Sequence, residues 1–141
     1  MTHQTVLDIA TRGAGLYEFT DRAERFVRDA KIESGLLTLF VRHTSASLLV
    51  QENADPDVKR DLMEYFKRLV PRADTPEMDY LIHRDEGPDD MPGHIKSALL
   101  PTSLSIPVMN GRLVLGTWQG IYLVEHRDAP HRREVALHLG E

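Results

Sequence analysis

The sequence predicts an α+β fold built mainly on antiparallel β-sheet, with two longer helices and one short helix. Short apolar runs of strand length recur along the chain, and two longer segments show helical periodicity. Strands and helices do not alternate regularly, as they would in a parallel α/β fold. A length of 141 residues suffices to bury a core and is too short for two typical domains. We therefore expect residues 1–141 to form one sandwich-like or barrel-like domain.

The first third of the chain predicts two strands that flank one helix. A strand is expected over residues 5–11, and Thr20 can cap a helix over about residues 21–31. The run from 36 to 41 is apolar at nearly every position and too short for a typical helix, which predicts a strand buried on both faces. The helix carries an apolar stripe at positions i, i+3, i+4 and i+7, formed by Ala23, Phe26, Val27 and Ala30.

The middle of the chain predicts a strand, a well-marked helix and a long polar connection. Small residues at 44–47 form a bend that leads into the strand. Asp55-Pro56 is typical of a helix start, and apolar residues then recur at helical spacing until Pro71 ends the helix. Residues 72–90 are polar, and connections of this length in compact domains are often functional or disordered. A short helix is expected over residues 92–99.

The last third predicts a hairpin and two further strands. Asn110-Gly111 between apolar runs signals a β-hairpin. The next strand ends in Glu125-His126-Arg127, and its alternation places His126 on a partly apolar face at the strand end, where sites are usually built. The final strand, over residues 134–139, alternates with the apolar side chains inward: Val135, Leu137 and Leu139.

Composition narrows the classes of function. The chain has no cysteine, so it forms no disulfide, and any metal must be held by His, Asp or Glu. A formal charge of -5 and the absence of a basic stripe argue against a nucleic-acid partner. No leader pattern and no apolar run of membrane-spanning length are visible, so we expect no membrane partner and a cytoplasmic location.

Four histidines are candidates for a site: His43, His83, His94 and His126. Three imidazoles would satisfy the geometry of a catalytic zinc site, which keeps one position open. Their separations match no compact metal motif, so scattered surface or core histidines remain the alternative. The acidic residues between 85 and 90 could supply oxygen ligands or a general base, or form a solvated loop.

Two other features have simpler interpretations. The segment His43-Thr44-Ser45-Ala46-Ser47 lacks the glycines of a nucleophile elbow, so its hydroxyls are expected to support a bend or to hold a phosphate. Trp118 is interpreted as a packing anchor rather than a platform for substrate, although Gln119 beside it leaves the second role open.

Four segments together resemble the YjbQ family, whose members are also called secondary thiamine-phosphate synthases. The segments are 43–47, 52–56, 86–96 and 116–122, and they occur in the order typical of the family. The resemblance extends over nearly the whole chain. It implies a compact α+β domain that assembles as a homotrimer, with metal or anion sites near the shared histidines.

The resemblance also implies roles for individual residues. His83, His94 and His126 become the metal-binding set, for zinc or another divalent transition metal, with magnesium as a further option. Lys96 and Arg127 are the candidates for anion contacts and, with His43, for catalysis. The residues expected to bind substrate are Ser45, Glu52, Asn53, Asp90 and Gln119.

The implied reaction joins an aminopyrimidine methyl diphosphate to a thiazole phosphate and releases pyrophosphate. Positive charge is needed to stabilise the departing diphosphate while the thiazole nitrogen attacks. Three imidazoles, however, suit zinc better than the magnesium that diphosphate chemistry usually recruits. Two alternatives therefore stay open: metal-dependent hydrolysis of a small phosphorylated or ester substrate, and a trimer that binds metal or a small ligand without catalysis.

Overall fold

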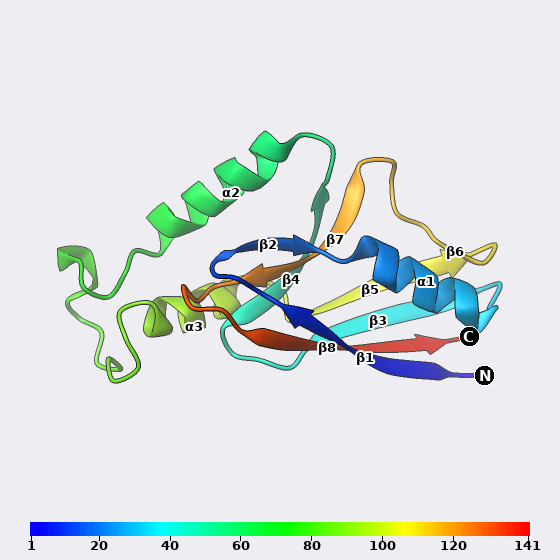
Figure 1. The fold of residues 1–141 in the computed structure, drawn as a ribbon, viewed down its shortest axis with the longest axis horizontal. Coiled ribbons are helices and arrows are strands. Elements are labelled where there is room, and N and C mark those ends of the chain that lie inside the picture. Colours follow the sequence, from blue (N-terminus) through cyan, green and yellow to red (C-terminus); the bar gives the residue numbers. More distant parts are fainter.

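Eight strands form two antiparallel sheets in the computed structural model, which describes residues 1–141 (Figure 1). The larger sheet has the strand order β1-β8-β3-β5-β6, and the smaller has the order β2-β7-β4. The predicted α+β class with antiparallel sheet is confirmed. The strands are β1 (His3–Ala10), β2 (Gly15–Glu18), β3 (Gly35–Val41), β4 (Ala46–Glu52), β5 (Ser103–Met109), β6 (Arg112–Leu113), β7 (Gln119–Glu125) and β8 (Arg132–Gly140).

Three α-helices and one turn of 3₁₀ helix complete the fold: α1 (Thr20–Ala30), α2 (Pro56–Leu69), η1 (Pro76–Met78) and α3 (Asp90–Leu99). The start of α2 agrees with the prediction, because the Asp55 carboxylate accepts a hydrogen bond of 2.9 Å from the backbone N–H of Asp57. None of the helices is both long enough and apolar enough to span a membrane.

The main core lies between the two sheets and α1. It collects 18 buried apolar residues, and both sheets contribute to it. The predicted alternation of β8 is confirmed, because Val135, Leu137 and Leu139 are each at most 1% exposed. On β7, Leu123 joins this core while Tyr122 and Val124 pack in a smaller cluster under α2. A strand covered on both faces thus leads to Glu125 and His126 at its end.

The outer face of β3 is exposed, so the prediction of a strand buried on both faces is wrong for the single chain. Leu36 is 45% and Phe40 is 50% exposed, and they alternate with fully buried residues. The register places Ala136 of β8 opposite both Phe40 and Val6 of β1, so an apolar row crosses three neighbouring strands. The apolar run therefore covers both faces of β3: one face packs in the core, and the other is exposed to solvent.

Two smaller predictions are also wrong. Thr20 is the first residue of α1 rather than its cap, because its hydroxyl donates to Glu18 Oε2 (2.7 Å) and accepts from the backbone N–H of Ile121 (2.8 Å). Trp118 is 63% exposed and is not a packing anchor in the single chain. The hairpin prediction is confirmed, since Asn110 and Gly111 both have positive φ, at 53° and 77°, between β5 and β6.

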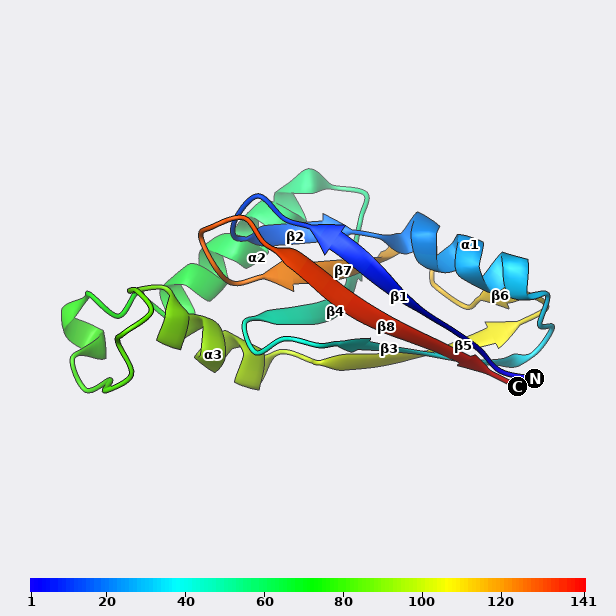
Figure 2. The same cartoon turned by 60° about the horizontal axis from the view of Figure 1, so that its bottom comes forward.

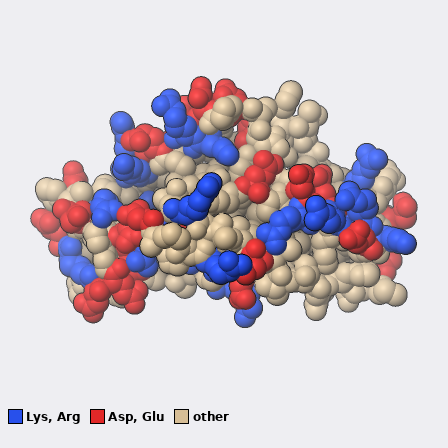
Figure 3. Space-filling view, viewed as in Figure 1, with Lys and Arg blue, Asp and Glu red and all other residues tan.

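The molecule is elongated, and the long polar connection lies at the end opposite the two termini (Figures 1 and 2). The connection carries η1 and leads into α3, which packs beside the end of the smaller sheet. Acidic and basic side chains are interspersed over the face drawn in Figure 3, including the part above α2. The fold therefore places the polar connection, α3 and the end of β7 at one end of the molecule.

Candidate metal site

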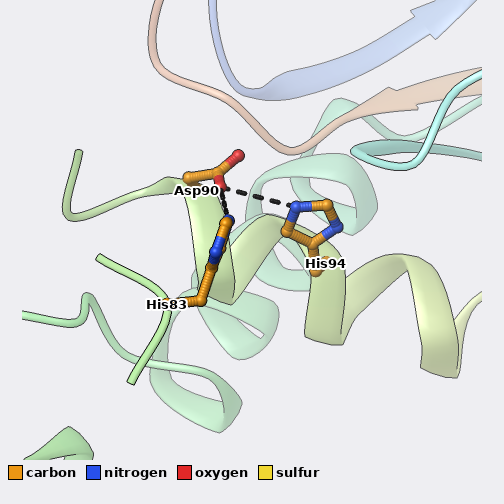
Figure 4. A group of neighbouring side chains, drawn as sticks. All are labelled: His83, Asp90 and His94. Carbon is orange, nitrogen blue, oxygen red and sulfur yellow. Dashed lines mark hydrogen bonds and ion pairs between the residues drawn. The ribbon is translucent and has the colours of Figure 1, made fainter. Parts of the chain in front are cut away.

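His83, Asp90 and His94 meet at the N-terminal end of α3 (Figure 4). Asp90 is the first residue of the helix and His94 follows one turn later, so both side chains project from one face. The polar connection brings His83 to the same place. The Nε2 atoms of His83 and His94 lie 2.9 and 3.4 Å from Asp90 Oδ2, and the imidazole rings are 5.6 Å apart between centroids.

Arg127 holds the Asp90 carboxylate in position. Asp90 is only 2% exposed, and its Oδ1 accepts a hydrogen bond of 2.8 Å from Arg127 Nη1. The same guanidinium donates from Nε to Asp89 Oδ2 (3.0 Å) and from Nη2 to the Glu86 carbonyl (3.0 Å). These hydrogen bonds leave Oδ2 of Asp90 facing the two imidazoles. They also occupy the guanidinium, so Arg127 orients a carboxylate instead of presenting a free cation to substrate.

The donor set suits a divalent transition metal. Candidate ligand atoms from the three residues lie within 4.8 Å of one another, and two of the separations, 2.9 and 3.4 Å, are near the roughly 3.4 Å between neighbouring ligands of tetrahedral zinc. Two imidazoles and one carboxylate fit zinc or a similar metal better than magnesium, which prefers oxygen ligands. His83 is half exposed, which leaves room for ring rotation and for a further ligand.

His126, which was expected in the metal set, lies nearby but makes a different contact. It is buried, and its Nε2 is 2.9 Å from Ser47 Oγ. Burial, with the Lys96 ammonium as the next cause, lowers the pKa of His126 to about 3, so the ring is neutral at ordinary pH. The Ser47–His126 pair has the spacing of a nucleophile and its base, but Ser47 is 0% exposed and no substrate reaches it.

A buried ion pair lies beneath this end of the sheets. Glu125 and Arg133 are 0% and 4% exposed and are joined by two hydrogen bonds. Arg133 Nη2 also donates to the hydroxyl of Ser45 at 2.9 Å. Ser45, which is expected from the sequence to bind substrate, therefore contacts the buried ion pair in this chain. His43 accepts a hydrogen bond of 2.8 Å at Nε2 from the backbone N–H of Glu134 and lies outside the His83 group.

The remaining expected substrate residues lie at the other end of the smaller sheet. Glu52 pairs with Gln119 at the end of β4 and β7 that is opposite Ala46 and Glu125. Asn53 Nδ2 donates to Glu18 Oε2 at 3.0 Å. Six residue steps along a strand span roughly 20 Å. Within one chain, therefore, Glu52, Asn53 and Gln119 are not brought to the metal group.

Lys96 lines a pocket on the far side of α3. It follows His94 by two residues, which is about 200° around the helix, so the two side chains point in nearly opposite directions. The pocket also includes Asp89 and Pro92 of this helical region and residues from the C-terminal half of α2. Asp89 lines the pocket and Asp90 belongs to the metal group, so the two features share the N-terminal end of α3.

Asp90 is expected from the sequence to line the same pocket as the histidines and to bind substrate, whereas the structure places it in the candidate metal group itself. The available signal was the spacing Asp90-x-x-x-His94, which puts both residues on one helix face. The expected helix began at residue 92, which left Asp90 in a loop and hid the pattern. The Glu125–Arg133 pair was also missed, since it joins residues on different sheets.

Comparisons with known proteins agree with the fold and state no activity. The family model described as UPF0047 protein YjbQ-like matches residues 5–141. A UPF0047 protein of Synechocystis sp. is 53% identical over 137 residues, covering 97% of this chain and 90% of the relative. The UPF0047 protein YjbQ of Escherichia coli O157:H7 is 44% identical over 143 residues and covers 100% of both chains.

Solved structures show the same architecture. A YbjQ-like protein of unknown function from Sulfolobus solfataricus P2 matches with a TM-score of 0.81 and 26% identity, covering 100% of each chain. A YjbQ/UPF0047 family protein from Clostridium acetobutylicum matches with a TM-score of 0.80 and 30% identity, covering 95% of this chain and 99% of the other. Because one family model matches nearly every residue and relatives align along almost the full length, the chain belongs to the UPF0047 (YjbQ-like) family.

Proposed function

We propose that the protein is a metal-dependent enzyme that acts on a small phosphorylated substrate, with thiamine phosphate formation as its specific reaction. The observation that carries the proposal is the convergence of His83, Asp90 and His94 on one point at the accessible end of α3. Three protein ligands with further positions open are typical of catalytic rather than structural metal sites. The choice of reaction rests on the motifs that resemble secondary thiamine-phosphate synthases.

In this reaction the bond from the pyrimidine methyl carbon to the diphosphate oxygen breaks, and the thiazole nitrogen forms the new bond to that carbon. A divalent ion held by His83, Asp90 and His94 would supply positive charge to stabilise the departing diphosphate. The protein's own part is to hold the ligands and to add charge. Arg127 orients Asp90, and Lys96 contributes an ammonium in the pocket on the opposite face of α3.

Hydrolysis of a small phosphorylated or ester substrate is the second candidate. The ligand set favours it, because two imidazoles and a carboxylate resemble the donor sets of hydrolytic zinc sites, whereas diphosphate chemistry usually uses magnesium held by oxygen. Both candidates need the same three residues. The products of the reaction distinguish them.

We expect the metal-loaded protein to form thiamine phosphate and pyrophosphate from the two substrates, and Asp90→Asn to lose at least about 100-fold of that rate. Zinc, manganese and magnesium would be supplied in turn to chelator-treated protein. Asp85→Asn is the matched control, because Asp85 is an exposed carboxylate in the same connection. Hydrolysis of the diphosphate without coupling would favour the hydrolase, and metal binding without turnover by any metal would defeat both enzymatic candidates.

We also propose that the protein assembles as a homotrimer through the outer face of the larger sheet. The supporting observation is the row Val6, Ala136 and Phe40, of which Val6 and Phe40 are about half exposed on β1 and β3, the strands on either side of β8. A neighbouring copy that covers this row would bury apolar surface that now faces water and would shield β1, an edge strand of the larger sheet. Assembly of this kind would also bring residues of different copies together.

Light scattering should therefore give a trimer mass for the wild-type chain. Phe40→Glu should shift the protein to monomer, because assembly would bury the new carboxylate in an apolar contact without a partner, which costs free energy. Val114→Glu is the control, since Val114 is 42% exposed and lies outside this row. A wild-type monomer at every concentration, or a Phe40→Glu trimer, would contradict the proposal.

A further inference from the structure

The pocket lined by Lys96 is a cavity between α2 and α3, beside the metal group but on the other face of α3. Its volume is about 370 Å³, within the usual range for small-molecule sites. Met63 and Val70 from α2 and its end, with Pro92 of α3, provide apolar walls. Lys96 and His126 lie deeper, at the side of the smaller sheet.

The basic groups of this cavity are less well paired than the acidic groups. The carboxylates of Asp89 and Asp128 already accept hydrogen bonds from Arg127 and Arg72, and Glu64 is paired with Arg68. The Lys96 ammonium makes no hydrogen bond or ion pair within the chain. Burial lowers the pKa of Lys96, and Asp128 and Asp89 oppose that effect. Two more cations lie at the exposed rim, namely Lys67 and Arg60, of which Arg60 is 3.7 Å from the Asp61 carboxylate.

His126 adds a neutral hydrogen-bonding group to the same cavity. Its Nε2 is joined to Ser47, and every buried side-chain nitrogen or oxygen has a partner. Nδ1 of His126 has no hydrogen-bond partner, so it is not among the fully buried atoms and must be accessible to solvent. The opening that His126 lines is this cavity. A Ser47 hydroxyl that donates to Nε2 leaves the proton on Nδ1, which then donates into the cavity.

We propose that this cavity binds a small organic phosphate, with the phosphate at Lys96 and His126 and the apolar part against Met63, Val70 and Pro92. A half-buried ammonium without a protein partner gains most from an anionic ligand, because a charge-assisted hydrogen bond replaces lost hydration. The apolar walls then favour an organic phosphate over the free ion.

The inference that the bound phosphate belongs to the substrate rests on the proposed function. Phosphate binding itself does not need the metal. Asp89 at the cavity and Asp90 in the metal group are adjacent in the chain, so a ligand at the rim would lie near both. The proposed anion site and the candidate metal site thus lie on two faces of one helix.

The test is an NMR titration of chelator-treated protein with phenyl phosphate and, separately, with inorganic phosphate. Wild-type protein should bind phenyl phosphate more tightly than inorganic phosphate, and Lys96→Gln should weaken phenyl phosphate binding about tenfold or more. Arg25→Gln removes one charge from an exposed, unpaired position on α1 and should change binding less than about twofold. Lys67→Gln at the rim should give a smaller loss than Lys96→Gln and serves if that variant does not fold.

Equal losses in Lys96→Gln and Arg25→Gln would overturn the proposal, because they would indicate attraction to net charge alone. Undiminished binding by both Lys96→Gln and Lys67→Gln, or no binding by wild-type protein, would overturn it too. Tighter binding of inorganic phosphate than of phenyl phosphate would contradict the role of the apolar walls. Metal stoichiometry is measured separately on portions of the same proteins after zinc is restored, so an absence of phosphate binding would leave the proposed metal function intact.

Discussion

We expect Asp90→Asn protein to lose stoichiometric zinc binding, while wild-type protein binds one zinc per chain. The Asp90 carboxylate supplies the oxygen that faces both imidazoles, and an amide is a poorer ligand that carries no charge. Zinc at about 100 times its Kd should stabilise the wild-type fold by about 2.7 kcal/mol and raise its Tm by roughly 5 to 10 °C. The Tm of Asp90→Asn should stay nearly unchanged when zinc is added.

Matched variants separate this result from a general loss of histidine or acidic groups. His94→Ala should behave like Asp90→Asn, while His3→Ala and Asp85→Asn, which change residues outside the group, should keep stoichiometric zinc. Dialysis followed by elemental analysis gives the stoichiometry, and calorimetry gives the Tm. Full zinc occupancy in both Asp90→Asn and His94→Ala would refute the assignment of these ligands.

Glu125→Leu is expected to be the most destabilising single substitution at this end of the sheets. It leaves the Arg133 guanidinium buried without its carboxylate and removes the acceptor for Thr11, at a cost of about 3 to 5 kcal/mol. Denaturant unfolding measures the loss. The double variant Glu125→Leu with Arg133→Met should recover much of it, since an apolar pair of similar volume avoids the uncompensated charge. A Glu125→Leu protein as stable as wild type would contradict this account.

The same ion pair predicts how stability depends on pH. Burial by itself raises the pKa of Glu125, but hydrogen bonds from Arg133 and Thr11 outweigh it and hold that pKa below its ordinary value of 4.5. The pair therefore contributes its full stability above that ordinary value and loses it as pH falls through the lower folded value. The double variant lacks this contribution, so its unfolding free energy should fall less steeply below about pH 4.5.

Local rules predicted much of the fold. Asp55-Pro56 marked the start of α2, the Asn110-Gly111 pair marked the hairpin, and the alternation of β8 gave its inward side chains. These features depend on residues close together in the chain, so the sequence carries their signal directly. The strand β2 was missed because four residues give too little periodicity to recognise.

Features that depend on distant parts of the chain were harder to predict. Leu36 and Phe40 are apolar like their buried neighbours, so composition alone does not tell which face of β3 meets solvent. His83 reaches Asp90 only because the polar connection folds back onto α3, and no spacing rule specifies such a path. His126 was expected to bind metal because it is at a strand end, whereas its tertiary partner is Ser47.

The measurement that tests the metal site most directly is the crystal structure of zinc-loaded wild-type protein, with anomalous diffraction recorded at the zinc edge. The account predicts one anomalous peak per chain, between Nε2 of His83, Oδ2 of Asp90 and Nε2 of His94, at about 2.0 to 2.2 Å from each atom. A peak bound by His126 in place of Asp90, or no peak at this end of α3 with zinc in excess, would contradict it.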